Sequence, residues 1–180
     1  MKNINNVNPY HEDNPEIFNS AINYSRINGS TVIQESTCNQ LIFNVMPNMG
    51  VKESLYIKEY RIGDNYIEAT FNREYQSSMK NSPSHLIFLS VLVHMQKMLY
   101  VFMCHNQGLK YDPYGKEVLK VWPTSLDIQM PKLITQCNDI IHRIDIKKIR
   151  KIKEKIFSVT ADTNINDIIT INGMAMIYIL

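Results

Sequence analysis

Residues 83–108 read PSHLIFLSVLVHMQKMLYVFMCHNQG and decide the fold. Ser82-Pro83 is a helix-start signal, and Gly108 is a helix-stop signal. Between these signals, apolar residues cover almost the whole circumference of a helix. They are Leu86, Ile87, Leu89, Val91, Leu92, Val93, Met95, Met98, Leu99, Val101, Phe102 and Met103. Because a helix that is apolar on all sides is enclosed by other structure, the stretch predicts one buried helix from about Pro83 to His105.

The same stretch has to be weighed against a membrane span, which needs about 20 nearly uninterrupted apolar residues. Here the apolar run contains Ser90, His94, Gln96 and Lys97. A lysine near the middle of a span is costly in lipid. We therefore predict a core helix of a soluble protein and no membrane partner.

The first 30 residues predict an N-terminal lead-in with a short helix. Asn14-Pro15 combines an N-cap residue with proline at the first helical position. The helix is expected to run through Ile17, Phe18, Ala21 and Ile22 and to end near Asn28-Gly29.

From residue 31 to the end, the chain reads as strands on both sides of the long helix. The expected strands are Gln40–Val45, Leu55–Arg61, Tyr66–Asn72, Val118–Trp122, Pro131–Gln136, Asp139–Ile146, Lys155–Thr163 and Ile168–Leu180. Turn residues at 62–65 and 164–167 predict two hairpins. Since tight turns join antiparallel strands, residues 31–180 predict a single α+β domain: an antiparallel sheet wrapped around one long central helix.

Composition excludes several classes of protein. The chain is 44% hydrophobic and 20% charged, as in ordinary globular proteins, and its net charge of +2 does not by itself favour a nucleic-acid partner. Cys38, Cys104 and Cys137 are odd in number and widely spaced, which favours buried free thiols over disulfides or a zinc site. Residues 1–14 lack the apolar core of a signal peptide, so we expect a cytoplasmic protein.

The order of elements resembles the hot-dog fold of acyl-thioester enzymes, the thioesterases and hydroxyacyl dehydratases. The resemblance covers roughly residues 40–180, with Asp139–Leu180 similar to the final three strands of that fold and a loop at Lys147–Lys153 between two of them. It implies a homodimer whose acyl chain lies beside the central helix. It also implies an active site where the start of that helix meets the other subunit.

A narrower set of residues around the helix is similar to the bacterial AvrD family. These residues are Ser84-His85-Leu86, Leu92-Val93, Gln96, Tyr100 and Gly108-Leu109. That family is associated with making acyl-derived glycolipid signals from β-ketoacyl thioesters and a sugar, so the resemblance implies a place in secondary-metabolite biosynthesis.

The sequence departs from the hot-dog enzymes at the carboxylate that often serves on the central helix. No Asp or Glu occurs between Glu74 and Asp112. At the expected helix start, Asn81, Ser84 and His85 are the candidate catalytic residues. Backbone N–H groups there would hold a thioester carbonyl, and His85 would act as general acid or base. The alternative is that these polar residues only cap the helix or face solvent.

Further along the helix, His94 and Tyr100 are candidate substrate-binding residues. Ser90, His94 and Lys97 share one helix face, which would line a pocket or form a polar stripe against a loop or a partner subunit. His85 and His94 are nine positions apart and cannot form a metal pair of the i, i+4 kind. No metal and no other cofactor is predicted.

Lys147, Lys148 and Arg150 belong to the one basic run, Lys147–Lys153. The run would dock the phosphates of coenzyme A or an acidic acyl carrier protein. Nucleic acid is a weaker alternative, and a solvated loop or a lysine-protected edge strand is the simplest one.

The sequence leaves two function hypotheses. The first is a thioesterase, dehydratase or acyl transfer or condensation enzyme that acts on acyl-CoA or acyl carrier protein in fatty-acid or polyketide-like metabolism. The second is a non-catalytic acyl-binding or dimeric interaction module of the same fold, which the missing helix carboxylate favours.

Overall fold

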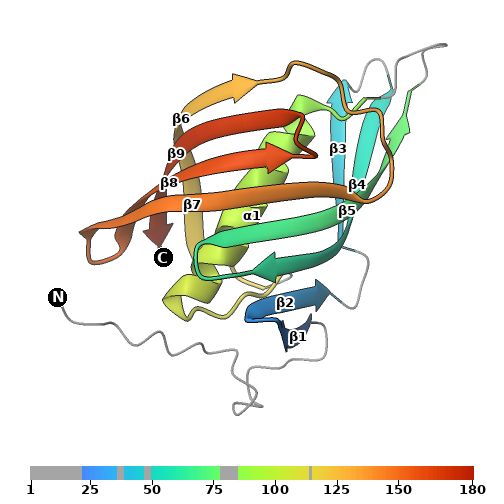
Figure 1. The fold of residues 1–180 in the computed structure, drawn as a ribbon. Helices are drawn as coiled ribbons and strands as arrows, with labels where there is room; N and C mark the ends of the chain where they lie inside the picture. Colours follow the sequence, from blue (N-terminus) through green and yellow to red (C-terminus); the bar gives the residue numbers. More distant parts are fainter. Residues whose placement is uncertain (1–21, 36–38, 47–49, 78–84, 114) are drawn as a thin grey trace.

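The computed structural model describes residues 22–35, 39–46, 50–77, 85–113 and 115–180. Its elements are β1 (Ile22–Ile27), β2 (Ser30–Glu35), β3 (Asn39–Met46), β4 (Val51–Ile62), β5 (Tyr66–Gln76), α1 (Phe88–Gln107), β6 (Leu119–Gln129), β7 (Ile140–Lys153), β8 (Ile156–Ile165) and β9 (Ile169–Ile179). Figure 1 shows the strands curling around α1, which lies on the concave face of the sheet. The predicted α+β architecture, one antiparallel sheet around one long helix, is confirmed.

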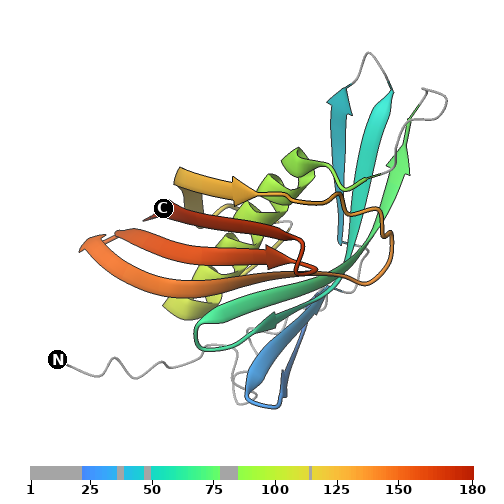
Figure 2. The same ribbon diagram turned by 45° about the horizontal axis from the view of Figure 1, so that its top comes forward.

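The strands follow the order β1-β2-β4-β5-β7-β8-β9-β6, and β3 also pairs with β4. Every pairing is antiparallel. One edge of β4 carries β5, while the other edge carries β3 over Val51–Ile57 and β2 over Tyr60–Ile62. This shared edge separates β3 from the β1–β2 hairpin, which extends from the opposite end of β4 (Figure 2).

Side chains alternate between the two faces of each strand, so one set of apolar side chains packs against α1. Leu55, Phe71, Ile144, Val159 and Ile177 are buried on the concave face from five different strands. They surround the buried side of α1, where Met98, Phe102 and Met103 are almost fully enclosed. The core is therefore a single layer between one helix and one curved sheet.

Helix α1 is less completely enclosed than its composition predicts. Leu89 and Val93 on its outer face are 48% and 36% exposed. By length and composition α1 qualifies as a membrane span, but 56% of its most apolar window is buried inside the fold. Packing against the sheet therefore accounts for most of its apolar surface.

The C-terminal end of α1 is as predicted. Gly108 takes a left-handed conformation with φ 66°, and its N–H group donates to the carbonyl of His105. The Leu109 N–H group donates to the carbonyl of Cys104 at 2.8 Å. These bonds satisfy the last carbonyls of the helix, and glycine adopts this backbone conformation without the penalty of a Cβ atom.

The prediction of a short N-terminal helix is wrong for residues 22–29, the part of it that the structure describes. Residues 22–27 form β1, which pairs with β2, and Asn28-Gly29 is the tight turn between them with φ angles of 50° and 78°. Two positive φ angles in a two-residue loop make a hairpin turn, so the same dipeptide closes a hairpin and does not end a helix. Ile17, Phe18 and Ala21 lie outside the described residues.

Two later segments also differ from expectation. Residues 131–136 are not a strand: this segment crosses from β6 to β7, and its backbone carbonyls bond to side-chain and backbone groups of other elements. The run Lys147–Lys153 is the second half of β7 and not a loop. It pairs with β8 alone, because β5 ends its pairing at Asp145. Of the loop and the edge strand expected for this run, the structure therefore has the edge strand.

Candidate functional site at the start of helix α1

Helix α1 begins at Phe88, five residues later than predicted, because its start is fixed by other elements. His85, Leu86 and Ile87 precede the helix in non-helical conformation. The Leu86 N–H group donates to the carbonyl of Ile134 at 2.8 Å, and the Ile87 N–H group donates to Glu53 Oε2 at 3.1 Å. These long-range bonds hold the two residues extended, so the local Ser82-Pro83 signal does not set the start.

Glu53 is one half of a buried ion pair that the sequence analysis missed. Its Oε1 atom lies 2.9 Å from Arg73 Nη1, and both side chains are fully buried. Arg73 also donates through Nε to the carbonyl of Gln136 at 3.0 Å. A buried ion pair is stable only when its remaining hydrogen-bonding groups are also used, as they are here.

A signal for this pair existed in the strand pattern. Glu53 lies between the apolar inward positions Val51 and Leu55, and Arg73 follows Phe71 by two residues, so both charges point to the concave face. The helix sequence contains no acid, and the acid at the helix start comes from β4, which only the fold brings there.

Of the predicted catalytic residues, the structure describes His85, while Asn81 and Ser84 lie outside the described residues. His85 is half-buried and precedes the first residue of α1 by three positions. Its Nδ1 atom is buried and has no hydrogen-bond partner among the described residues. A histidine with an unused ring nitrogen at a helix start is placed to exchange a proton with a ligand.

The sequence analysis expected His94 to line a pocket or to face a loop or a partner subunit, but the structure buries it in the core. It lies on the concave side, fully buried, with its Nδ1 atom 3.0 Å from Nδ1 of His142 on β7. Its ring meets Phe71 edge-on, with centroids 5.1 Å apart. Burial and then the neighbouring His142 lower the pKa of His94 well below 6.5, and burial lowers the pKa of His142 to about 3, so both rings are neutral.

The buried histidines leave hydrogen-bonding groups unused. Nε2 of His94, Nε2 of His142 and Oγ of Ser90 have no partner in the part of the chain that the structure describes. Ser90 and His94 are one helical turn apart on α1. Ser90 and His94 of the predicted polar face are thus buried, whereas Lys97 is half-buried. His142 could not be assigned to this cluster without the register of β7.

Tyr100 and the basic residues lie apart from the helix start. Tyr100 Oη accepts a hydrogen bond from the Val118 N–H group at 3.1 Å, and burial raises its pKa. Lys147, Lys148 and Arg150 are exposed on the end of β7 that projects past β5, on the far side of the molecule from the start of α1 (Figures 1 and 2). Lys147 pairs with Asp162 at 2.9 Å. The structure does not bring these residues together with His85.

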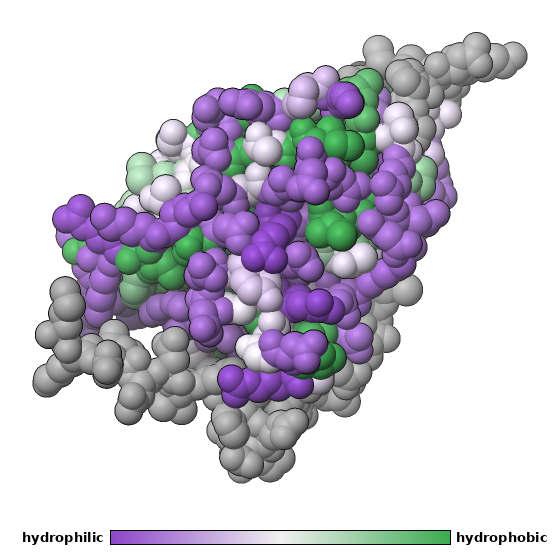
Figure 3. All heavy atoms as spheres, viewed as in Figure 1, coloured by the Kyte–Doolittle hydropathy of each residue, from purple (hydrophilic) through white to green (hydrophobic). Residues whose placement is uncertain are grey.

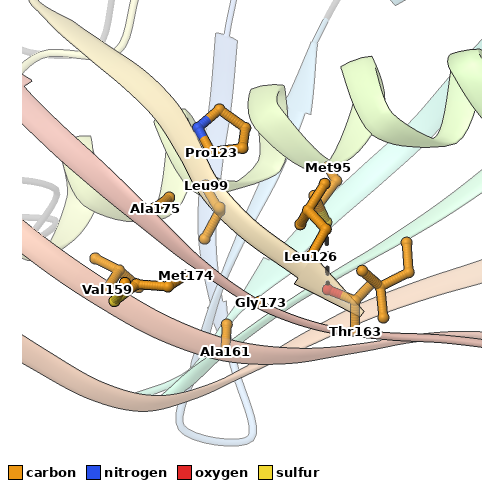
Figure 4. Close-up of a pocket in the computed structure, with 11 residues that line it drawn as sticks. Met95, Leu99, Pro123, Leu126, Val159, Ala161, Thr163, Gly173, Met174 and Ala175 are labelled. Atoms are coloured by element: carbon orange, nitrogen blue, oxygen red, sulfur yellow. Dashed lines mark hydrogen bonds between the residues drawn. The ribbon is translucent and has the colours of Figure 1, made fainter. Parts of the chain in front are cut away.

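An apolar pocket lies between α1 and the strands β6, β8 and β9 (Figure 4). Its volume is small, about 20 Å³, so its lining side chains would have to move apart for a ligand to enter. Its lining residues are Met95, Leu99, Pro123, Leu126, Val159, Ala161, Thr163, Ile171, Gly173, Met174 and Ala175. Thr163 Oγ1 donates to Met95 Sδ at 3.6 Å, so the polar atom at its edge is already occupied.

Gly173 shapes this pocket by allowing β6 to approach β9. A Cβ atom at this position would lie 2.8 Å from Leu126 Cδ2 and 2.9 Å from the Ser125 backbone oxygen. Because a backbone atom cannot move aside as a side chain can, any larger residue would displace β6 at the pocket wall.

A groove continues the pocket along the outer face of α1. It shares Met95, Pro123 and Leu126 with the pocket and adds Leu89, Leu92, Val93, Gln96 and Trp122, with a volume of about 430 Å³. Leu89 is in the first turn of α1. The groove therefore leads from the pocket to the helix start that His85 precedes.

Free thiols and metal ligands offer no second site. Cys104 is a buried free thiol, as predicted, and burial raises its pKa to about 12. Cys137 is free but exposed, so the expectation of burial is wrong for it, and Cys38 lies outside the described residues. Over those described residues, no group of three or more His, Cys, Asp or Glu side chains is placed to hold a metal ion.

Comparison with known proteins finds similarity in structure and none in sequence. No protein-family model matches the chain. No curated protein matches it either.

Among solved structures, one similar chain is a thioesterase from Haemophilus influenzae, with a TM-score of 0.43 and 11% identity over 70% of this chain and 79% of that one. A conserved protein from Pseudomonas aeruginosa has a TM-score of 0.43 and 10% identity over 66% of this chain and 83% of that one. The PaaI protein from the phenylacetic acid degradation operon of E. coli has a TM-score of 0.41 and 8% identity over 70% and 79% of the two chains. These values leave the chemistry to be argued from this chain's own residues, which form one antiparallel sheet around one central helix, the arrangement that the resemblance to the hot-dog fold implied.

Proposed function

We propose that this protein binds the acyl group of an acyl thioester beside α1 and hydrolyses the thioester at the start of that helix. The observation that carries the proposal is the apolar pocket between α1 and strands β6, β8 and β9, together with the groove that leads from it to Leu89. Pockets for small molecules are concave, mostly apolar and carry few polar groups, as here. The acyl chain would lie along the groove and reach into the pocket as its lining side chains move apart, with the thioester end near Leu89.

The first turn of α1 would receive the thioester carbonyl. The N–H groups of Phe88, Leu89 and Ser90 have no partner inside the helix, as in the first turn of any α-helix. They lie at the positive end of the helix dipole, which stabilises a developing oxyanion. Glu53 supports this arrangement indirectly, because it binds the preceding Ile87 N–H group and so fixes where the turn begins.

His85 would act as the general base of the hydrolysis. Its imidazole ring would take a proton from water while the water oxygen attacks the thioester carbon. The carbon–sulfur bond then breaks, the thiolate takes a proton, and the products are a carboxylic acid and a free thiol. Asn81 and Ser84 stay predicted contributors next to His85.

The same proposal includes a homodimer, an acyl group carried by coenzyme A or by a carrier protein, and a cytoplasmic site of action. Among the described strands, β3 pairs with β4 alone, which leaves its other edge open to a second subunit. A second copy there would lie near the start of α1, since β4 supplies both the partner of β3 and Glu53. Light scattering on the purified chain tests the dimer directly.

The second candidate function is a non-catalytic acyl-binding module. It is favoured by the state of the nearest carboxylate, Glu53, which is fully buried and bound to Arg73 and to Ile87. A carboxylate in that position is not free to activate water. In this alternative His85 would contact the ligand without transferring a proton.

One experiment separates these functions. The protein would be incubated with acyl-CoAs of increasing chain length while thiol release is followed, and binding would be measured in parallel by calorimetry. We expect thiol release that is lost in His85→Ala and kept in His105→Ala, a matched variant at the other end of α1. Binding without thiol release in the wild type would leave the module as the function.

Gly173→Val tests the pocket in the same assay. The added side chain would displace β6 and reduce acyl binding with little effect on the start of the helix. If no acyl-CoA of any length binds, and Gly173→Val changes nothing, the acyl-thioester proposal fails.

A further inference from the structure

The convex face of the sheet carries a second surface, formed where β6, β9, β8 and β7 lie side by side. The strand registers place outward side chains in three rows: Lys120, Tyr178, Ile156 and Lys153; Trp122, Met176, Ser158 and Arg150; and Ser125, Met174, Thr160 and Lys148. We call these residues the outer patch. Their neighbours along each strand, such as Phe157, Val159 and Ile177, are buried on the other face. Most of the outer patch therefore points away from α1, while Trp122 also borders the groove and Met174 also borders the pocket.

The outer patch is positively charged and contains no acid. Lys120, Lys148, Arg150 and Lys153 are all exposed, and none forms an ion pair with a carboxylate in the described part of the chain. Elsewhere on β7, by contrast, Lys147 pairs with Asp162 and Arg143 with Asp145. The next row, Asp127, Asn172, Asp162 and Asp145, returns to negative charge. Because the cations of the outer patch have no carboxylate partners and the next row is acidic, the patch is a surface of limited extent that would attract an anion.

Two aromatic rings lie among these cations. Trp122 is 67% exposed and Tyr178 is 38% exposed. Trp122 pairs with Met176 and Tyr178 pairs with Lys120, so the two aromatic residues are diagonal neighbours, about 7–8 Å apart at their Cα atoms. A tryptophan is usually well buried, so one that is two-thirds exposed on a strand needs an explanation.

Apolar side chains extend this surface. Met174 is 40% exposed, and Met176 and Ile156 are partly exposed beside the rings. Figure 3 shows one face of the molecule, on which hydrophilic side chains predominate and hydrophobic side chains form separate groups among them. The patch thus offers flat apolar faces and positive charge together.

We propose that the outer patch binds single-stranded nucleic acid. Two successive bases would stack on Trp122 and Tyr178, while Lys148, Arg150, Lys153 and Lys120 contact the phosphates. Rings on a sheet face combined with a basic border suit this ligand, because every base has a flat face to stack and every nucleotide carries a charge. An acidic polypeptide offers charge without flat rings, and a duplex hides its base faces.

This proposal does not depend on the thioesterase proposal, since the cations of the outer patch lie outside the pocket and the groove, although the two surfaces meet at Trp122 and Met174. It also explains how a chain with a net charge of only +2 would bind a polyanion: the positive charge is concentrated in the outer patch. The sequence analysis treated Lys147–Lys153 as one run, whereas the structure selects Lys148, Arg150 and Lys153 and adds Lys120 from β6.

Trp122 makes the test direct because it is the only tryptophan in the chain. Oligothymidine and oligouridine would be titrated into the full protein while tryptophan fluorescence is followed. Stacking on Trp122 should quench the emission in step with binding measured by anisotropy of a labelled oligonucleotide. Tyr178→Ala should weaken binding by about fivefold or more, the effect of one lost base stack.

Charge variants test the phosphate contacts. The double variant Lys148→Gln/Arg150→Gln should weaken binding and flatten the plot of log affinity against log salt by about 1.4, at about 0.7 per lost phosphate contact. The matched double variant Lys110→Gln/Lys132→Gln removes two exposed lysines outside the patch and should change neither the quenching nor the slope.

Three outcomes would overturn the proposal. One is no binding of either oligonucleotide at low salt. Another is binding that leaves Trp122 fluorescence unchanged. The third is equal or tighter binding of heparin, duplex DNA, an acidic peptide or anionic lipid vesicles, since these ligands share the charge but offer no accessible base faces.

Discussion

The sheet buries two polar clusters under α1, and the clusters differ in how fully their hydrogen-bonding groups are used. At the helix start, Glu53 and Arg73 bind each other, the Ile87 N–H group and the carbonyl of Gln136. One turn into the helix, His94 and His142 bind each other and leave their Nε2 atoms without partners in the described chain. The first cluster positions backbone, whereas the second keeps unused hydrogen-bonding capacity inside the core.

The comparison teaches why the helix start is a better candidate site than the middle of the helix. A fully satisfied ion pair resists rearrangement, so it holds the first turn of α1 in one geometry. Such rigidity is what a preorganised oxyanion site needs. The histidine cluster is sealed by Phe71 and Tyr60 and lies away from the groove.

The largest expected effect comes from breaking the ion pair. Glu53→Ala leaves the Arg73 guanidinium buried without its carboxylate, which should lower the free energy of unfolding by about 3–5 kcal/mol. Urea denaturation followed by circular dichroism measures the loss. Glu59→Ala is the matched control: it removes a glutamate from the same strand, but that residue pairs with the exposed Arg61, so the loss should stay within about 1 kcal/mol. Equal losses of unfolding free energy in the two variants would contradict the claim that the buried Glu53–Arg73 pair stabilises the fold more than the exposed pair does.

A smaller effect is expected at the histidines. His142→Leu leaves Nδ1 of His94 without its partner and should cost about 1–3 kcal/mol. The double variant His94→Leu/His142→Leu removes both partners and should recover much of that loss. The corresponding double variant Glu53→Leu/Arg73→Leu should not recover, because it leaves the Ile87 N–H group and the Gln136 carbonyl without partners. A histidine double variant as unstable as the sum of its singles would show that the cluster is satisfied by ordered water.

The pH dependence of stability sharpens the same contrast. The folded-state pKa of His142 is about 3 and that of His94 is also lowered, whereas an unfolded histidine titrates near 6.5. Between these values the unfolded state binds more protons than the folded state. Stability is therefore complete above about pH 6.5 and falls as the pH drops toward 3, by up to about 1.4 kcal/mol per pH unit for each histidine.

Denaturation at a series of pH values measures this slope. His105, whose pKa burial lowers to about 4, contributes in the same direction, so the slope is read as a difference between variants. The double variant His94→Leu/His142→Leu should flatten the curve, and Glu59→Ala should leave that part of it unchanged. A slope between pH 4 and 6 that does not change in the histidine variant would contradict burial of both neutral rings.

Local signals predicted the parts of the fold whose contacts are local. The turn at 164–167 and the stop at Gly108 were found because a few adjacent residues determine each of them. The apolar circumference of 86–103 gave the central helix for the same reason. Asn28-Gly29 was recognised as a turn signal but was assigned to a helix end. The same dipeptide can close a hairpin, and which of the two forms depends on whether strands flank it.

The site was harder to predict because its parts come from distant elements. The start of α1 is set by Glu53 and Ile134, and the surroundings of His94 are set by His142 on β7. His85 was identified from its place near the helix start, but no short-range pattern connects it to a carboxylate on β4. The outer patch depends on the register of four strands, which the sequence does not give.

The hydrogen bond between Glu53 and Ile87 has a consequence for the order of folding. It joins residues 34 positions apart, and Glu53 reaches its buried position only when β4 has paired with β5, which carries Arg73. Contacts of long sequence separation form late, because the entropy of closing the loop has to be overcome first. The C-terminal turns of α1, capped locally by Gly108, are therefore expected to nucleate the helix. Its first turn would join only when the β4–β5 hairpin is in place, so substitutions there would speed unfolding more than they slow folding.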